Sequence, residues 1–460
     1  MDLRAGWLAQ VTGGRVVAGA SDSAIGRVVT DTRQLQAGDF FIALRGPRYD
    51  GHQFLDVARE RGACGALVDA ACGGPFWGAT VQVADTLRGL QDLAAAVRRD
   101  SGARVIAITG SAGKTTTKET LAALLGARFD VVRNRGNLNN HIGLPLSLLE
   151  LRTRPDVAVM ELGMNHAGEI SRLVEIARPD VRIWTNVGDA HLGHFASADA
   201  IADAKAEILE GASPDSVLVC NADDARVMSR VSAFAGRTIT FGTAPGADLR
   251  ATEIEDLGAD GMRARVHTPA GDALVHTPLL GRGNLSNVLA SMAVALDSGV
   301  ALDDIVARVA TMAPADRRGV VHRLRHGIVV IDDSYNSSPS ALRAALDVVG
   351  RSHALRKVAA LGEMLELGDH AEALHAECGR AAAAAGLARL VTVGGAAAEA
   401  MAVAAVQAGM PTTAVTFVAD SGRAADELAP ALAPGDLVLV KGSRGIRMDA
   451  VTDRLLAEHA

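Results

Sequence analysis

The chain has 460 residues, a length that predicts two to four domains at about 100–200 residues per domain. Hydrophobic residues make up 49% and charged residues 22%, which excludes a disordered or collagen-like chain; aromatic residues make up only 3%, so aliphatic side chains must build the interior. The net charge of −7, without a basic run, argues against nucleic-acid or membrane-surface partners, although phosphate could still be bound locally.

The N-terminus and the cysteines indicate a cytoplasmic protein. The start, MDLRAGWLAQ, lacks the apolar core of a signal peptide, and the uncharged stretch 400–419 is broken by polar residues and proline, so we expect no membrane insertion. The cysteines lie far apart and form no zinc or redox motif, which predicts reduced thiols at Cys64, Cys72, Cys220 and Cys378.

The pattern of strands and helices predicts an α/β fold with three domains. Residues 1–83 mix short strands (27–31, 40–44 and 65–69) with one helix near 52–62, and predict a small α/β domain. Strands alternating with helices then predict a central parallel-sheet domain at 84–315, with a small antiparallel excursion at 249–280 before a helix at 284–298. A second alternating series predicts a C-terminal Rossmann-like domain at 316–460. The strands expected in the two larger domains are 104–109, 130–133, 156–162, 180–187, 216–223, 327–331, 357–361, 388–393, 414–418 and 436–442.

The segment TGSAGKTTT, at 109–117, follows a predicted strand and precedes a helix, and it predicts a phosphate-binding loop for ATP. Backbone N–H groups and the helix N-terminus suit phosphates, Lys114 adds a positive charge, and Thr115 or Thr116 offers a hydroxyl to Mg²⁺. The spacing is shorter than the standard Walker form, because Ile108 stands where the first glycine is expected. The alternative is a chance glycine-rich turn. The loop residues expected to contact ATP are Gly110, Ser111, Ala112, Gly113, Lys114, Thr115 and Thr116.

This shortened loop resembles that of the Mur ligase family of ATP-dependent amide-bond-forming enzymes. Six further segments resemble blocks of that family in order and spacing, across all three predicted domains. They are GNLNNHIGLPLSLL (136–149), MELGMNHAGEI (160–170), NVGDAHLGHF (186–195), IDDSYNSSP (331–339), LGEMLELG (361–368) and VKGSRGIRMD (440–449).

The pair DDSYN and LGEMLELG points to one branch of this family. That branch joins D-alanyl-D-alanine to UDP-N-acetylmuramoyl-tripeptide through an acyl phosphate, giving the pentapeptide precursor of peptidoglycan, whereas the branch that adds the third amino acid carries an Asp-Asn-Pro-Arg block absent here. The resemblance implies ATP and two Mg²⁺ ions, and we expect a monomer. The alternatives are a ligase that adds a single amino acid and a non-catalytic nucleotide-binding homologue.

The resemblance also implies the catalytic and metal-binding residues. These are Lys114, Glu161, His191 and Lys205, with Thr115, Glu161, His191 and Lys205 holding the metal and Lys205 carbamylated on its amine. From residue type alone, Glu161 at a strand end suits Mg²⁺, whereas His191 would be taken for a satisfied polar or buried histidine and Lys205 for part of a solvated helix face.

Substrate contacts are implied in two segments. In the N-terminal domain, Thr32 and Arg33 match the UDP-sugar-binding region, the alternative being a structural turn with a surface arginine. In the central domain, Asn137, Asn139 and Asn140 match the block that positions the nucleotide-linked peptide, although such asparagines commonly just satisfy turns.

Further ATP contacts are implied around the third domain, which would bind the dipeptide and close on ATP, with Asp333 anchoring the loop. The residues are Asn284, Asn287, Arg318 and Asn336. Three positions depart from the family pattern: Gly283 replaces a histidine, Arg317 a glycine and Ser338 an asparagine.

Overall fold

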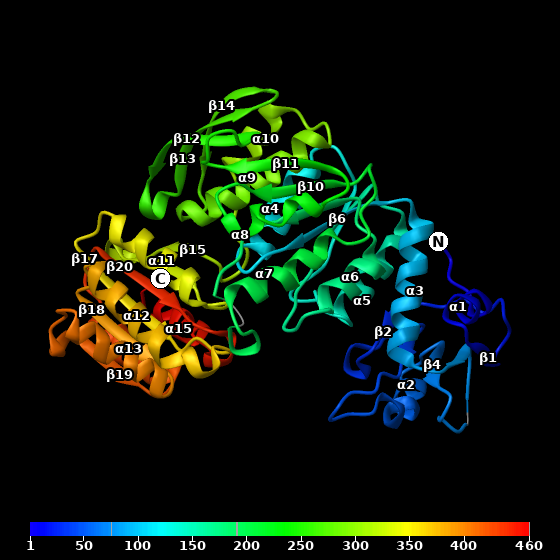
Figure 1. Ribbon diagram of the computed structural model, residues 1–460. Helices are drawn as coiled ribbons and strands as arrows, with labels where there is room; N and C mark the ends of the chain where they lie inside the picture. Colours follow the sequence, from blue (N-terminus) through cyan, green and yellow to red (C-terminus); the bar gives the residue numbers. More distant parts are fainter. Residues whose placement is uncertain (75, 190–191, 460) are drawn as a thin grey trace.

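The computed structural model describes residues 1–74, 76–189 and 192–459. It confirms the α/β fold, which is built on three sheets: β1 to β5 in an N-terminal body, β6 to β14 in a central body and β15 to β20 in a C-terminal body. Figure 1 shows the N-terminal body, in blue, and the C-terminal body, in yellow to red, on opposite sides of the central one.

The N-terminal body is a five-stranded sheet of order β1-β5-β4-β3-β2, in which only β1 is antiparallel to its neighbour. The apolar runs of β3 and β4 are fully buried, as parallel strands covered on both faces require. A 3-10 turn, Gly51–Phe54, precedes the helix expected near 52–62. The elements are α1 (Ala5–Thr12), β1 (Arg15–Ala18), β2 (Val28–Val29), β3 (Phe40–Ile42), α2 (Leu55–Glu60), β4 (Gly65–Asp69) and β5 (Thr80–Val83).

Helix α3 (Thr86–Ser101) joins the N-terminal body to the central body. Its start is fixed by Asp85, whose carboxylate accepts a hydrogen bond from the Arg88 backbone N–H, and it ends at Gly102 in a left-handed conformation, with φ of 75°. The helix packs against α1 and β4 of the N-terminal body. It also packs against two central helices, α5 (Gly143–Leu148) and α6 (Glu169–Ala177).

The central sheet has the order β14-β13-β12-β11-β10-β9-β6-β8-β7 and is parallel from β7 to β12. The antiparallel excursion is present, but β12 pairs in parallel with β11, so the hairpin extends the central sheet. The elements are β6 (Arg104–Thr109), α4 (Lys114–Leu125), β7 (Val131–Arg133), α5 (Gly143–Leu148), β8 (Val157–Glu161), α6 (Glu169–Ala177), β9 (Val181–Trp184), α7 (Ala198–Ala206), β10 (Val217–Asn221), α8 (Ala225–Met228), β11 (Arg237–Gly242), β12 (Leu249–Asp256), β13 (Met262–Thr268), β14 (Gly271–Thr277), α9 (Gly281–Asp297) and α10 (Leu302–Val309).

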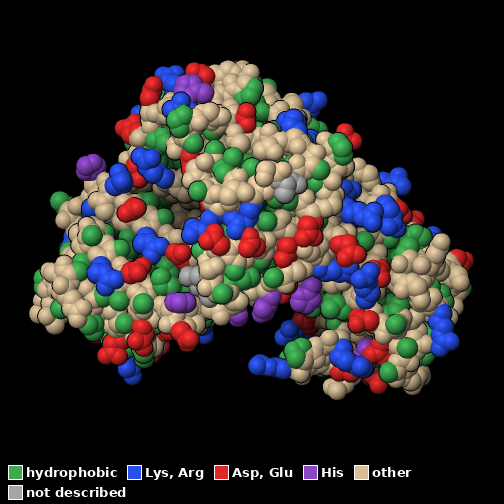
Figure 2. All heavy atoms as spheres, viewed as in Figure 1, with side chains coloured by type: hydrophobic (Ala, Val, Ile, Leu, Met, Phe, Trp, Pro, Cys, Tyr) green, Lys and Arg blue, Asp and Glu red, His purple; other side chains and the backbone are tan. Residues whose placement is uncertain are grey.

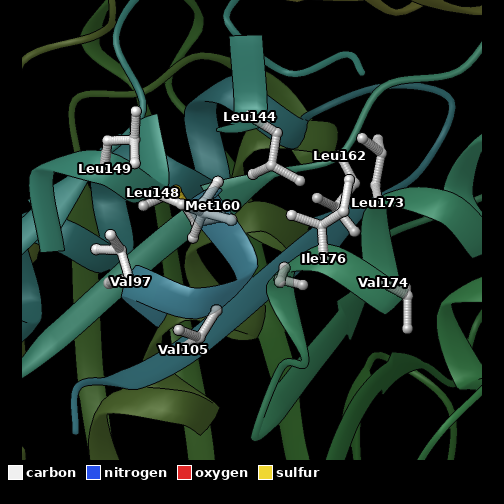
Figure 3. Packing of buried hydrophobic residues seen from close by; sticks show 14 of the residues in the cluster. Val97, Val105, Leu144, Leu148, Leu149, Met160, Leu162, Leu173, Val174 and Ile176 are labelled. Carbon is white, nitrogen blue, oxygen red and sulfur yellow. The ribbon is translucent and has the colours of Figure 1, made fainter. Parts of the chain in front are cut away.

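Two hydrophobic clusters cover the two faces of this sheet. Alternate residues of β6 divide between them: Val105 packs with side chains of α3, α5 and α6, as Figure 3 shows, whereas Ile106 packs with those of α4 and α9. Helices on both faces leave the carboxyl ends of the parallel strands as the edge where a ligand can enter.

The C-terminal sheet has the order β15-β16-β20-β17-β18-β19, with only β15 antiparallel. Strand β15 was not expected from the sequence, and neither were β1, β5 and β11 of the other two sheets. No helix in the described ranges has the length and apolar composition needed to cross a membrane. The elements are β15 (Val320–Arg323), β16 (Val329–Asp333), α11 (Pro339–Arg351), β17 (Arg356–Gly362), α12 (Ala371–Ala384), β18 (Arg389–Val393), α13 (Ala396–Gln407), β19 (Val415–Val418), α14 (Ser421–Leu428), β20 (Asp436–Lys441) and α15 (Asp449–His459).

The close packing of α12 on α13 generates a stability prediction. A Cβ at Gly379 would overlap the backbone oxygen of Met401, so Gly379→Ala must push the helices apart and lower the free energy of unfolding by about 1–3 kcal/mol. As a control, a Cβ at Gly350 in α11 would lie 3.6 Å from its nearest neighbour, and Gly350→Ala should raise stability by about 0.5–1 kcal/mol. Urea unfolding of both variants checks the packing; equal effects at the two positions would contradict it.

Candidate active site

A cavity of about 700 Å³ lies between the central and C-terminal bodies. Figure 2 shows the surface hollowed where these bodies meet, with Lys and Arg side chains at the rim. Its central wall comes from the loop before α4, the segment 136–141, the end of β8 and the start of α9. Its C-terminal wall comes from the loop after β16, the helix α11 and the segments 365–367 and 441–445.

The glycine-rich loop between β6 and α4 is held close to neighbouring side chains. Gly110 and Gly113 have φ of 152° and 83°, and a Cβ would overlap Thr185 Oγ1 at the first position and the Asn287 amide at the second. Only glycine allows both this backbone conformation and this close approach. The loop therefore presents its backbone at the N-terminus of α4, where N–H groups lack helical partners.

Asn186, which follows β9, holds the middle of the glycine-rich loop by hydrogen bonds to the backbone of Ala112. Its Oδ1 accepts from Ala112 N at 2.9 Å and its Nδ2 donates to Ala112 O at 3.1 Å, while the Thr185 hydroxyl donates to the same oxygen at 2.8 Å. Asn186 also lines the cavity. We did not select Thr185 or Asn186 from the sequence; the available signal was the position of Asn186, like that of Glu161, at the carboxyl end of a buried strand.

Glu161 ends β8 and is 4% exposed. The Thr115 hydroxyl donates to its Oε2 at 2.8 Å and Asn139 Nδ2 donates to its Oε1 at 2.8 Å. Buried Asn134 fixes the backbone of the same residue, because it accepts from Glu161 N at 3.0 Å and donates to Glu161 O at 3.2 Å. A hydroxyl beside a carboxylate is a hard oxygen donor set of the kind Mg²⁺ prefers. Thr116 lines the cavity but has no such bond, so the geometry favours Thr115.

Two buried lysines lie at or near this wall. Lys114 Nζ donates to Gly110 O at 2.7 Å; burial lowers the pKa of its amine, the nearby Glu161 carboxylate opposes this shift, and the charge of Arg318 adds to it. Lys205, in α7, is 1% exposed, and burial together with the charge of Lys114 holds its pKa well below the usual range of a lysine. Lys205 is therefore buried, not part of a solvated helix face.

The predicted metal set is only partly described. His191 lies outside the described residues. Within residues 1–74, 76–189 and 192–459, no group of three or more His, Cys, Asp or Glu side chains is arranged to hold a metal ion. Of the four predicted metal ligands, the structure therefore describes Thr115, Glu161 and Lys205.

The predicted asparagines divide into different local roles. Asn139 bonds Glu161, whereas Asn140 Oδ1 accepts from the backbone N–H groups of Ile142 and Gly143 at 3.1 and 2.9 Å and so supports the start of α5. Asn137 is exposed on the cavity wall. The side chain of Asn140 thus bonds nearby backbone groups, as asparagines in turns commonly do.

Helix α9 adds polar groups beside the glycine-rich loop. Asn287 Nδ2 donates to Asn284 Oδ1 at 3.1 Å, and Asn284 Nδ2 donates to Leu280 O at 2.9 Å. Both asparagines line the cavity. Gly283 lines the cavity as well, and a Cβ at this position would have no neighbour within 4 Å.

Arg318 and the loop after β16 form the facing wall. The Arg318 guanidinium lies over the Tyr335 ring, 4.1 Å from its centroid. Lys441, 3% exposed, forms an ion pair with Asp333 and donates to Asn336 O at 3.1 Å, so this ion pair anchors the loop that carries Asn336. Lys441 lines the cavity and was not selected from the sequence, although the block 440–449 contains it.

The structure also describes Arg317 and Ser338, the other two positions at which the sequence departs from the family pattern. Arg317 adopts φ of 55°, a conformation that favours glycine, and its guanidinium pairs with Asp453 at 3.1 Å. Ser338 precedes α11 without a side-chain cap bond.

Thr32 and Arg33 lie apart from the cavity, in the N-terminal body. Arg33 is paired with Asp31 at 2.7 Å and its side chain is 86% exposed. The structure therefore brings together the predicted central and C-terminal residues that it describes, and leaves these two at a separate surface.

Gly188, Asp189 and Gly193 contact the two walls of the cavity. Gly188 N donates to Ser111 Oγ at 2.8 Å on the central side. On the C-terminal side, Arg343 pairs with Asp189 at 2.8 Å, and Gly193 N donates to Glu366 O at 3.0 Å. The C-terminal body thus contacts the segment that holds the glycine-rich loop.

Comparisons with known proteins agree with this arrangement. Residues 108–295 match the family description "Mur ligase middle domain", and residues 317–444 match "Mur ligase, glutamate ligase domain". A UDP-N-acetylmuramoyl-tripeptide–D-alanyl-D-alanine ligase from Synechocystis sp. is 36% identical over 96% of this chain and 94% of its own. The crystal structure of MurF from Acinetobacter baumannii has a TM-score of 0.88 at 35% identity and covers 99% of both chains.

A further solved structure contains a nucleotide. The MurF ligase of Thermotoga maritima, in complex with ADP, has a TM-score of 0.84 at 28% identity over 94% of this chain and 97% of its own. With family matches over more than half of its length and relatives of this similarity, the chain belongs to the Mur ligase family.

Proposed function

We propose that the chain is an ATP-dependent ligase that joins D-alanyl-D-alanine to UDP-N-acetylmuramoyl-tripeptide through an acyl phosphate. The observation that carries this proposal is the hydrogen bond from Thr115 to Glu161, which puts a carboxylate beside a phosphate-binding loop in a cavity shared by two bodies. Relatives named for this reaction, similar over nearly the whole chain, support the same substrate pair.

ATP binds across the two walls in this proposal. The backbone of the glycine-rich loop and Lys114 bind its phosphates, and the likeness to an ADP-bound ligase supports this placement. The side chains assigned to the ribose, base or outer phosphate are Asn284, Asn287, Arg318 and Asn336.

The proposed metal ligands are Thr115, Glu161, His191 and Lys205, the last as a carbamate. They would hold two Mg²⁺ ions, which supply positive charge that stabilises the phosphate oxygens during transfer. A carbamate forms when a neutral amine attacks CO₂, making an N–C bond and releasing one proton. The burial that lowers the pKa of Lys205 favours that neutral amine.

The substrates extend beyond the ATP cavity. We assign UDP to Thr32 and Arg33 in a domain of residues 1–83, and the linked peptide to Asn137, Asn139 and Asn140 in a domain of residues 84–315. The dipeptide binds the domain of residues 316–460. We propose a cytoplasmic monomer.

In the reaction, the terminal carboxylate of the tripeptide attacks the γ-phosphorus of ATP, and ADP leaves. The dipeptide amine then attacks the acyl phosphate, and a tetrahedral intermediate collapses to the amide with release of phosphate and a proton. Lys114, which is buried, and Arg318 face the developing negative charge, and a positive charge fixed in place before the reaction stabilises such charge strongly. Holding amine and acyl phosphate together removes much of the entropic barrier of a two-substrate step.

A substrate screen tests the function. Purified protein with ATP, Mg²⁺ and a panel of UDP-muramoyl-tripeptides should release phosphate with D-alanyl-D-alanine and form the pentapeptide. A product only with single amino acids would establish the alternative ligase, and nucleotide binding without any product would establish the non-catalytic homologue.

Loss of Lys114 tests the phosphate-binding loop. Lys114→Ala should lower ATP-dependent phosphate release at least about 100-fold, because a charge facing the transferred phosphate is lost. Lys357→Ala is the control, since Lys357 donates to Gly350 O in the C-terminal body and does not line the cavity. Retained activity in the Lys114 variant would refute the loop assignment.

Carbamylation of Lys205 is testable by mass and by rescue. With ¹³C-bicarbonate, active protein should carry the added mass of CO₂ and a carbamate carbon signal near neutral pH, and both should disappear on acidification, because protonation removes the nucleophilic amine. Lys205→Ala should lose the signal and most activity, and short carboxylic acids should restore part of the activity. An unmodified amine in active enzyme, with no rescue, would count against the carbamate.

A further inference from the structure

Arg444 follows β20 and lies on the C-terminal wall of the cavity. Its guanidinium is 5.4 Å from the centroid of the Tyr335 ring, the same ring that Arg318 covers at 4.1 Å. Neither arginine has a side-chain hydrogen bond or an ion pair with any described residue. Two uncompensated positive charges thus lie at one aromatic ring, an arrangement that favours anionic ligands.

The two arginines have different further neighbours. Arg318 lies close enough to Lys114 for its charge to influence that amine, which places it near the phosphate-binding loop. The residues on either side of Arg444 contact Leu365 instead: a Cβ on Gly445 would lie 2.9 Å from Leu365 Cδ1, and Leu365 N donates to Ser443 Oγ at 2.9 Å.

Leu365 adds an apolar surface to the cavity wall. Its side chain is 44% exposed, an unusual condition for a leucine in the wall of a cavity. Ala341, Ala344 and Ala345 of α11 line the same cavity with methyl groups. A free guanidinium in a cavity whose wall also exposes small apolar groups complements a small ligand that carries a carboxylate and methyl side chains.

We propose that Arg444 binds the terminal carboxylate of the incoming dipeptide, with Leu365 packing against its methyl groups, and so determines specificity for a free carboxyl end. This inference rests on the proposed function. The dipeptide must direct its amine toward the acyl phosphate at the loop side, so its carboxylate lies farther from the loop than its amine does. A guanidinium suits a carboxylate because its planar donors can bond both oxygens at once.

The test compares D-alanyl-D-alanine with D-alanyl-D-alaninamide, which keeps the methyl groups and loses the carboxylate. The natural protein should prefer the acid strongly. Arg444→Gln should raise the KM for the acid about 10- to 100-fold, leave the KM for ATP unchanged and use acid and amide about equally well. Arg444→Lys should restore part of the preference, because it restores the charge without the paired donors.

Arg447→Gln is the matched control, since Arg447 is an exposed arginine of the same turn that does not line the cavity. An unchanged acid preference in Arg444→Gln would overturn the inference, as would a raised KM for ATP alone, which would assign Arg444 to phosphate. Absence of product with either dipeptide in the natural protein would instead refute the proposed function, so the two failures are distinguishable.

Discussion

The hydrogen bonds around Glu161 are the interaction on which the central wall of the cavity depends. They connect the end of β8 to the start of α4 through Thr115 and to the asparagine segment through Asn139, while Asn134 fixes the Glu161 backbone. A carboxylate that is 4% exposed requires such partners, because a buried charge without them is costly. The same bonds that satisfy the carboxylate therefore bring the glycine-rich loop and the asparagine segment to one point.

The second constraint is the distribution of charge. The chain as a whole carries −7, yet Lys114, Arg318 and Arg444 line one cavity, and the two arginines lack anionic partners among the described residues. The phosphates of ATP and the carboxylates of the proposed substrates would supply negative charge to this arrangement. Contacts of Asp189 with Arg343 and of Gly188 with Ser111 also link the C-terminal body to the glycine-rich loop.

Much of the architecture follows from sequence patterns, because buried parallel strands read as continuous apolar runs. Strand β11, RTITFG, was missed because its alternating polar pattern differs from the neighbouring runs, and β15 was missed because it is a short antiparallel strand at the sheet edge. Motifs and the family resemblance singled out the glycine-rich loop, Glu161 and Arg318, and the structure places all three on the walls of one cavity. Tertiary contacts between distant segments decide the rest: the choice of Thr115 over Thr116 and the roles of Asn186 and Lys441. Spacing along the chain does not encode these contacts.

The central claim is that this cavity joins an amine to a carboxylate that ATP has first phosphorylated. The most direct measurement uses a tripeptide substrate with ¹⁸O in both oxygens of its terminal carboxylate, followed by mass analysis of the released phosphate. An acyl phosphate predicts that one labelled oxygen moves into the phosphate for each amide formed. Amide formation that leaves the phosphate unlabelled would contradict the account.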